Sequence, residues 1–170
     1  MSGNASHTDN SACFDATLTY YIDFVAKGAS ISGFPEWLPS ERVVEQRVID
    51  TLRKVFELNG FIGIETRAVE TGASLLKKGE TSKEIYLLSR LQEVGHESDT
   101  PIEERLGLHF DLTVPLSRYV VEHSGALTFP FKRWQIQKVW RGERPQEGRF
   151  REFVQADIDV IGAGDLPDHY

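Results

Sequence analysis

Residues 131–162 read FKRWQIQKVW RGERPQEGRF REFVQADIDV IG, and this stretch decides the fold. Its first part, 131–141, is rich in aromatic and branched residues and alternates in polarity, which predicts a strand. Residues 142–150 are charged and contain Pro145 and two glycines, which indicates a loop. Residues 152–161 alternate again and predict a second strand. We therefore expect an antiparallel hairpin.

The two faces of the second strand differ in chemistry. Its even positions are apolar and form the expected buried face: Val154, Ala156, Ile158 and Val160. Its odd positions are Phe153, Gln155, Asp157 and Asp159. In an antiparallel pair Arg141 projects to the same side as Phe153 and Gln155. That surface then gathers a guanidinium, an aromatic ring, an amide and carboxylates, a set that can hold a nucleotide and an amino acid.

Each of these residue types suits one part of such a ligand. A guanidinium matches a phosphate and stabilises charge developing on it, and the candidates are Arg141, Arg144, Arg149 and Arg151. A phenylalanine ring stacks on adenine, and Glu143 can accept from the adenine amino group. The acidic and amide candidates for an ammonium group and an imidazole N–H are Asp111, Thr113, Gln155 and Asp159. From the residues alone, a charged hairpin with solvated arginines is an equal alternative to a phosphate site.

Before the hairpin, residues 108–115 resemble a strand that runs directly into a helix. Thr113 can cap this helix, Pro115 fits its first turn, and the expected buried stripe is Leu116, Tyr119 and Val120. Asp111 and Thr113 lie at the strand end, where helix capping is favoured over ligand binding. A single histidine in an apolar strand, His109, is expected to be a core or surface residue.

Further upstream the pattern predicts a helix and a strand. The helix has Ser40 as its N-cap, ends at Asn59-Gly60, and presents an apolar stripe of Val44, Val48, Leu52, Val55 and Phe56. Residues 61–69 are expected to form a strand beside it, 84–88 a short strand, and 92–104 a solvated loop. Residues 1–30 show no clear periodicity and receive no function. The domain division expected is thus 1–30 and 31–170.

Composition limits the class of protein. With 170 residues, 40% hydrophobic and 26% charged, the chain fits one globular domain with one core. No apolar run suits a membrane span and no signal peptide is recognisable, so we expect a cytoplasmic protein with no membrane partner. The lone Cys13 predicts neither a disulfide nor a zinc site. A net charge of -7 argues against coating nucleic acid by charge alone, and no DNA partner is expected.

Three segments together resemble one known family. Residues 141–155 resemble motif 2 of class II aminoacyl-tRNA synthetases in the form found in the histidine enzymes. Asp111-Leu112-Thr113 is similar to the acidic-x-Thr element that holds histidine, and residues 33–39 resemble the entry to motif 1. Motif 1 then spans about 39–70 and motif 2 about 131–162. The resemblance implies an α+β fold, with an antiparallel sheet flanked by helices.

The resemblance also implies a role for each site residue. The ATP-binding residues would be Arg141, which is also the catalytic residue, Glu143, Arg149 and Phe153. The histidine-binding residues would be Asp111, Leu112, Thr113, Arg141, Gln155 and Asp159. The substrates implied are histidine, ATP with Mg²⁺, and tRNA(His), with no metal site of the protein's own. Histidine would be activated to histidyl-adenylate and transferred to tRNA, and the longer protein is expected to be a homodimer.

Length and two substitutions bear on these expectations. The chain ends at Tyr170, before the expected positions of motif 3 and an anticodon-binding domain, so it is expected to be an incomplete and inactive catalytic domain. Arg67-Ala68 stands where the motif 1 strand usually carries a proline, and Asp111 stands where many relatives carry glutamate.

Two other function classes stay open. The first is a regulatory paralogue that senses histidine without ligase activity, like the accessory subunit of ATP phosphoribosyltransferase; the presence of the whole ATP half-site disfavours it. The second is a non-catalytic interaction or RNA-binding fragment that docks on a partner through the basic hairpin; its binding would fall steeply with salt and would not depend on histidine or ATP.

Overall fold

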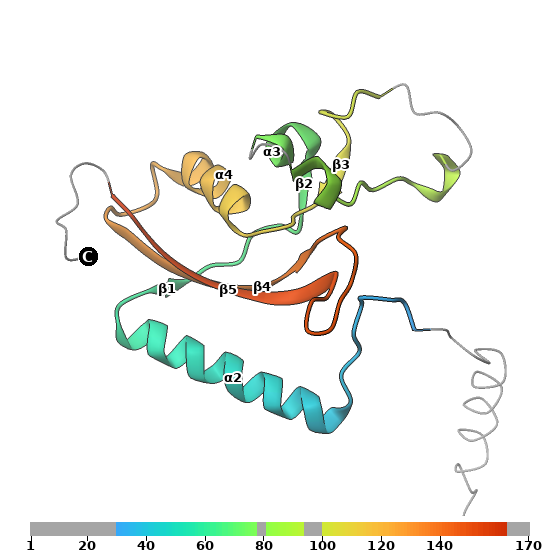
Figure 1. Ribbon diagram of the computed structural model, residues 1–170. Helices are drawn as coiled ribbons and strands as arrows, with labels where there is room; N and C mark the ends of the chain where they lie inside the picture. The colour runs from blue at the N-terminus through green and yellow to red at the C-terminus, as the bar shows by residue number, and fades with distance from the viewer. Residues whose placement is uncertain (1–29, 78–80, 94–99, 163–170) are drawn as a thin grey trace, which may run out of the picture. The chain divides into compact units, whose positions relative to one another are not determined.

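The hairpin forms as predicted and organises the computed structural model, which describes residues 30–77, 81–93 and 100–162 (Figure 1). The chain divides into two units, 1–31 and 32–170, and the account below concerns the second. Strands β4 (Phe131–Trp140) and β5 (Glu152–Ile161) pair antiparallel in unbroken register, from Phe131 opposite Ile161 to Trp140 opposite Glu152. The segment 1–30, except its last residue, lies outside the described residues, and so does Cys13.

A third, very short strand completes this sheet. Strand β1 (Ile62–Gly63) lies parallel to β4, so the sheet has the order β1-β4-β5 and is not wholly antiparallel. The predicted strand 61–69 is therefore wrong over most of its length. The reason lies in Thr66, whose backbone bonds to a side chain of β4 instead of a strand: Gln137 Nε2 donates to its carbonyl at 2.6 Å, and its N–H donates to Gln137 Oε1 at 3.3 Å.

Helix α2 (Pro39–Leu58) covers one face of the sheet. It begins one residue before the predicted cap Ser40, because Pro39 takes the first helical position and the Glu41 carboxylate accepts from the Leu38 N–H at 2.9 Å. It ends where predicted, with Gly60 at φ +78°.

The predicted apolar stripe of α2 is only half buried. Leu52 and Phe56 are half-buried, whereas Val44, Val48 and Val55 are 60%, 54% and 49% exposed. A hollow of about 1120 Å³ lies between α2 and the hairpin, lined among others by Ile49, Leu52, Ile136, Val154 and Ala156. The even face of β5, predicted to be buried, is buried only in part: Val154 and Val160 are half-buried, Ile158 is 47% exposed, and Ala156, which lines the hollow, is exposed.

A second small sheet carries the segment that leads to the site. Strands β2 (Val69–Thr71) and β3 (Leu106–Leu108) pair antiparallel, followed after β2 by helix α3 (Gly72–Leu76). The 3₁₀ turns η1 (Thr81–Glu84) and η2 (Leu91–Glu93) flank an extended segment. The predicted strand 84–88 is reduced to one bridge, Leu87 to Gly107. In the predicted loop 92–104, residues 100–104 form turns and 94–99 lie outside the described residues.

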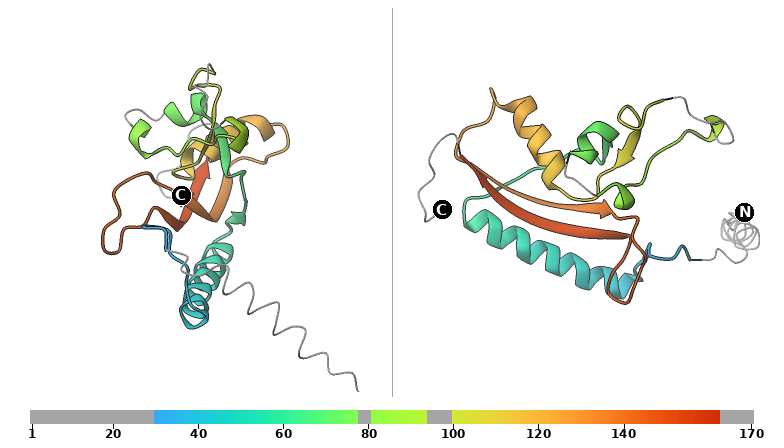
Figure 2. Two further views of the ribbon diagram at one scale, coloured as in Figure 1. Left: turned by 90° about the vertical axis from the view of Figure 1, so that its right-hand side faces the viewer. Right: turned by 45° about the horizontal axis from the view of Figure 1, so that its top comes forward.

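Helix α4 (Thr113–His123) lies across the sheet from α2, as Figures 1 and 2 show. The predicted strand leading into it is wrong beyond Leu108, where β3 ends. Thr113 is the first helical residue and Leu112 the N-cap; the side-chain bond to the first turn comes from Asp111, whose Oδ1 accepts from the Val114 N–H at 3.3 Å. Pro115 lies in the first turn and Leu116 is buried, as predicted.

The core of the described chain contains six buried apolar side chains: Leu75, Phe110, Leu112, Leu116, Phe131 and Val139. Polar side chains are buried beside them, including Glu70, His109, Asp111, Arg133 and Gln135. The fold is α+β. In the part that the structure describes, no helix is both long and apolar enough to cross a membrane.

Candidate active site

The odd-numbered side chains of the hairpin share one face, as predicted. Cζ of Arg141 lies 5.1 Å from the centroid of the Phe153 ring, and its Nη2 donates to Gln155 Oε1 at 3.5 Å. The backbone N–H of Arg141 donates to the Arg151 carbonyl at 2.8 Å, which continues the ladder beyond β4. Gln155 Nε2 in turn donates to Asp157 Oδ2 at 2.9 Å. A guanidinium, a ring, an amide and a carboxylate are therefore brought into one row.

The segment before α4 anchors Arg141 through the Phe110 carbonyl, which accepts from Arg141 Nε at 3.1 Å. His109 holds this segment in place on two sides. Its N–H donates to Ala68 O at 2.9 Å, and its carbonyl accepts from the Trp140 N–H at 3.1 Å. The site arginine is thus tied to the residue next to Asp111.

The His109 ring is a core element, in line with the prediction. It is fully buried, and Nε2 lies 2.7 Å from Lys138 O. Because a carbonyl only accepts, Nε2 must carry the proton, while Nδ1 is buried with no hydrogen-bond partner among the described residues. Burial lowers the pKa of His109, against the smaller opposing effects of the Lys138 carbonyl, Glu70 and Asp111. The ring is therefore neutral at pH 7.

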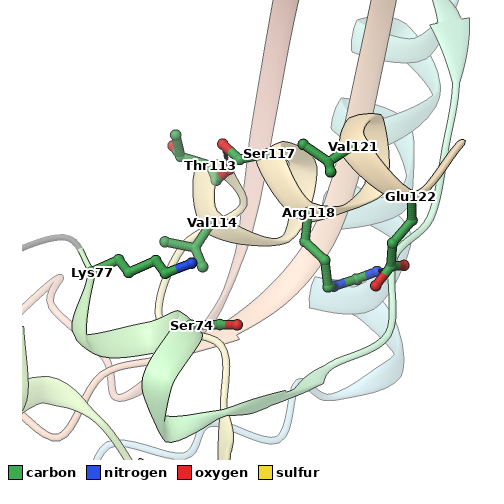
Figure 3. Close-up of a pocket in the computed structure, with 8 residues that line it drawn as sticks. All are labelled: Ser74, Lys77, Thr113, Val114, Ser117, Arg118, Val121 and Glu122. Carbon is green, nitrogen blue, oxygen red and sulfur yellow. Dashed lines mark hydrogen bonds and ion pairs between the residues drawn. The ribbon is translucent and has the colours of Figure 1, made fainter. Parts of the chain in front are cut away.

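The three residues of the acidic-x-Thr element lie in different surroundings. Asp111 is 4% exposed and caps α4, and Leu112 is fully buried in the core. Thr113 is exposed and lines a pocket of about 570 Å³ between α3 and α4, together with Ser74, Lys77, Ser117 and Arg118 (Figure 3). The structure therefore brings Asp111 next to the arginine anchor and leaves Thr113 at this second pocket.

The loop 142–150 holds two predicted ATP contacts in an ion pair, Arg149 with Glu143. Arg144 is exposed. Arg151 has a structural role: its Nε donates to the Glu143 carbonyl at 2.9 Å, and its stem fills the space beside Gly33, where a Cβ would lie 2.8 Å from Arg151 Cγ. Gly33, at φ +86°, also accepts from the Arg151 N–H at 2.7 Å.

Asp159 lies at the far end of β5, six residues from Phe153, which corresponds to roughly 20 Å along a strand. Its Oδ2 is 2.5 Å from Nη2 of Arg133, a fully buried residue of β4 directly opposite it. Sequence reasoning missed Arg133. The signal that could have found it is parity, because Arg133 and Arg141 are separated by an even number of positions and so share a face.

Metal ligands are not gathered at this face. Among the described residues, no three His, Cys, Asp or Glu side chains are placed so that they could hold a metal ion.

Comparison with known proteins finds close relatives among histidine–tRNA ligases. The chain is 99% identical over 146 residues to the histidine–tRNA ligase of Bifidobacterium longum subsp. infantis, covering 86% of this chain and 31% of the relative. It is 63% identical over 153 residues to the histidine–tRNA ligase of Micrococcus luteus, covering 86% of this chain and 33% of the relative. The chain thus spans about a third of the length of these curated relatives. No family model matches it.

Solved structures of similar fold include enzymes of the same name. The histidyl-tRNA synthetase of Nostoc sp. superposes with a TM-score of 0.68 at 45% identity, over 83% of this chain and 30% of that one. An ATP phosphoribosyltransferase regulatory subunit/histidyl-tRNA synthetase from Bacillus halodurans gives 0.65 at 21% identity, over 81% and 33%, which is a likeness of fold. With this similarity in sequence and in its α+β fold, the chain belongs to the histidyl-tRNA synthetase family of class II aminoacyl-tRNA synthetases.

Proposed function

We propose that the protein carrying this chain is a histidine–tRNA ligase, which activates histidine with ATP and transfers the histidyl group to tRNA(His). The observation that carries the proposal is the meeting of Arg141, Phe153 and Gln155 on one face of the hairpin. A phosphate-binding group, a stacking surface and an amide are adjacent there. Identity of 63% and 45% to proteins of that name supports the same reaction.

The ATP side of this site is formed by Arg141, Glu143, Arg149 and Phe153. Phe153 presents its ring to adenine, and Arg141 binds the α-phosphate, where negative charge grows during the reaction. Glu143 and Arg149 pair with each other, so ATP binding replaces one ion pair with two ligand contacts: Glu143 to the adenine amino group and Arg149 to the γ-phosphate. An exposed ion pair contributes only about 0–1 kcal/mol, so breaking the pair between Glu143 and Arg149 reduces the free energy of ATP binding only slightly. Mg²⁺ enters with ATP and offsets phosphate charge.

The histidine side is formed by Asp111, Leu112, Thr113, Gln155 and Asp159, with Arg141 at the carboxylate. Gln155 already accepts from Arg141, which places its amide at the junction of the two sides. Asp111 is assigned to the α-amino group and Asp159 to the imidazole; Thr113, which the resemblance assigns to the α-amino group as well, lines the second pocket between α3 and α4. Leu112 supports this segment from the core, where it is fully buried.

The reaction then needs positioning and charge stabilisation from the protein. An oxygen of the histidine carboxylate attacks the α-phosphorus, the bond to the bridging oxygen breaks, and diphosphate leaves. The histidyl group next passes to a ribose hydroxyl at the tRNA end, and AMP leaves. Arg141 stabilises the charge on the phosphoryl oxygens in the first step, and no covalent enzyme intermediate is required.

Exposed apolar side chains along α2, of which Val48 lines the hollow beside the hairpin, support a homodimer. Val44, Val48 and Val55 are about half or more exposed on one helix, an arrangement that a second copy of the chain would bury. Because the reaction supplies protein synthesis, we place it in the cytoplasm.

The test is histidine-dependent exchange of labelled diphosphate into ATP, with the protein at its natural length. Arg141→Ala should lower the exchange rate by about 10²–10³-fold, the effect of removing one preorganised donor to a developing charge. The control is Lys138→Ala, since Lys138 is an exposed member of the opposite face. Unchanged exchange in Arg141→Ala would reject the assignment of Arg141. Wild-type protein that binds histidine but shows no exchange would instead identify a histidine sensor.

A further inference from the structure

The far end of the proposed histidine side contains a buried cation that sequence motifs do not explain. Arg133 and Gln135 of β4 are both fully buried, and they point to the same face as Arg141. Arg133 Nη2 lies 2.5 Å from Asp159 Oδ2, and Nη1 donates to the Asp157 carbonyl at 3.5 Å. One guanidinium therefore contacts two consecutive odd positions of β5.

Burying this guanidinium is unfavourable for folding. Burial lowers the pKa of Arg133, and the nearby Asp159 and Asp157 oppose that effect only in part. The close contact to Asp159 is an ion pair without hydrogen-bond geometry: Nη2 and Nε, like Gln135 Oε1, have no hydrogen-bond partner among the described residues. A buried donor left unpaired destabilises a protein.

An apolar residue would fill this position at lower free energy. The same face of β4 holds Phe131 and Val139, which are 7% and 0% exposed. Replacing a buried ion pair by apolar groups is often neutral or stabilising. The arginine is therefore better explained by what it does to Asp159 than by stability.

The two partners of this ion pair differ in exposure, and the difference indicates how Arg133 acts on Asp159. Arg133 is fully buried, whereas the side chain of Asp159 is 45% exposed. The guanidinium contacts Oδ2 and so holds the Asp159 carboxylate from its buried side. The other oxygen of that carboxylate, Oδ1, is a second hydrogen-bond acceptor. A fixed, ionised carboxylate is a strong acceptor for a ring N–H.

We propose that Arg133 is a positioning residue for histidine recognition: it holds the Asp159 carboxylate so that Oδ1 accepts from the imidazole N–H of the substrate. The inference rests on the proposed function and adds a residue to it.

Steady-state diphosphate exchange with the natural-length protein tests this step. Arg133→Gln should raise the KM for histidine about tenfold or more, with the KM for ATP within about twofold of wild type. Arg133→Lys should restore part of the loss, because it keeps the charge without the fork. The matched control is Lys138→Gln, which breaks the other cross-strand pair, Lys138 with Glu152, on the opposite face.

A double-variant cycle separates positioning from simple structural support. If Arg133 acts through Asp159, the variant Arg133→Gln/Asp159→Asn should bind histidine no worse than Asp159→Asn alone. Additive losses, or equal rises in both KM values, would overturn the inference. Circular dichroism and thermal unfolding establish that each variant is folded. If Arg133→Gln is unfolded, Arg133→Lys alone decides, with an unchanged histidine KM counting against the proposal.

The two proposals fail in different ways. Absence of exchange in the wild-type protein defeats the proposed function. Normal wild-type exchange with an Arg133→Gln histidine KM equal to wild type defeats only the role of Arg133.

Discussion

The guanidinium of Arg141 lies over the ring of Phe153, 5.1 Å from Cζ to the ring centroid, while its Nη2 donates to Gln155. Phe153 and Gln155 are two positions apart on β5, so both point to the same face. Arg141 therefore contacts an aromatic ring on one side and a polar amide on the other. This geometry makes the two neighbours separable by experiment, since they are assigned to different ligands.

Phe153→Ala should mainly raise the KM for ATP, whereas Gln155→Ala should mainly raise the KM for histidine. Loss of the ring should raise the KM for ATP about tenfold or more, because base stacking on an aromatic side chain contributes about 1–3 kcal/mol. Loss of the amide should raise the KM for histidine more than that for ATP. Diphosphate exchange measured over both substrate concentrations checks this. Equal effects on both substrates would assign Gln155 a structural role.

The ion pair between Glu143 and Arg149 should matter for ATP and hardly for stability. Their side chains are 24% and 57% exposed, so either alanine variant should change the free energy of unfolding by no more than about 1 kcal/mol. The KM for ATP should rise about tenfold in each, because each removes a proposed ligand contact. Urea unfolding and exchange kinetics measure the two effects. Arg53→Ala, which breaks an exposed pair on α2, is the control and should leave the KM unchanged.

His109 should make stability depend on pH. Because burial lowers its pKa below the ordinary value of about 6.5, its contribution is complete above that value and is lost as the pH falls through the folded-state pKa. Each unit by which the pKa is lowered corresponds to about 1.4 kcal/mol. Protonation would also place a second buried N–H on Nδ1, which has no partner among the described residues.

Urea unfolding between pH 7.5 and 5 tests this. In His109→Gln, which keeps an N–H donor for Lys138 O but does not titrate, the loss of stability towards pH 5 should be smaller than in wild type. His123→Gln, the same substitution at an exposed histidine, is the matched control. Parallel curves for wild type and His109→Gln would contradict the prediction.

Two glycines should respond differently to alanine. A Cβ on Gly72 would lie 1.9 Å from the Ile102 carbonyl oxygen, so the backbone must shift and Gly72→Ala should destabilise by about 1–3 kcal/mol. Gly125 has no described atom within 4 Å of its Cβ position. Gly125→Ala should be neutral or stabilise by up to about 1 kcal/mol. Thermal unfolding measures both, and equal melting temperatures would show that the loop at Ile102 moves freely.

The sequence by itself determined the hairpin and the face on which its site residues lie. Side chains alternate between the two faces of a strand, and the length of the loop sets which residues of the two strands face the same side. Arg141, Phe153 and Gln155 were therefore predicted to share a face. The end of α2 was likewise local, since Gly60 accepts a positive φ without strain. Such features depend on a few neighbouring residues, and a single sequence contains them.

Other features were decided only in the tertiary structure, because they depend on contacts between distant segments. Thr66 does not form part of a strand, because the side chain of Gln137, 71 residues later, hydrogen-bonds to its backbone. Asp111 rather than Thr113 bonds the first turn of α4, and Val44, Val48 and Val55 of α2 are exposed while Leu52 and Phe56 are half-buried. The pairing of Arg133 with Asp159 is of the same kind: parity gives the face, but burial of one partner and exposure of the other follow from packing across the sheet.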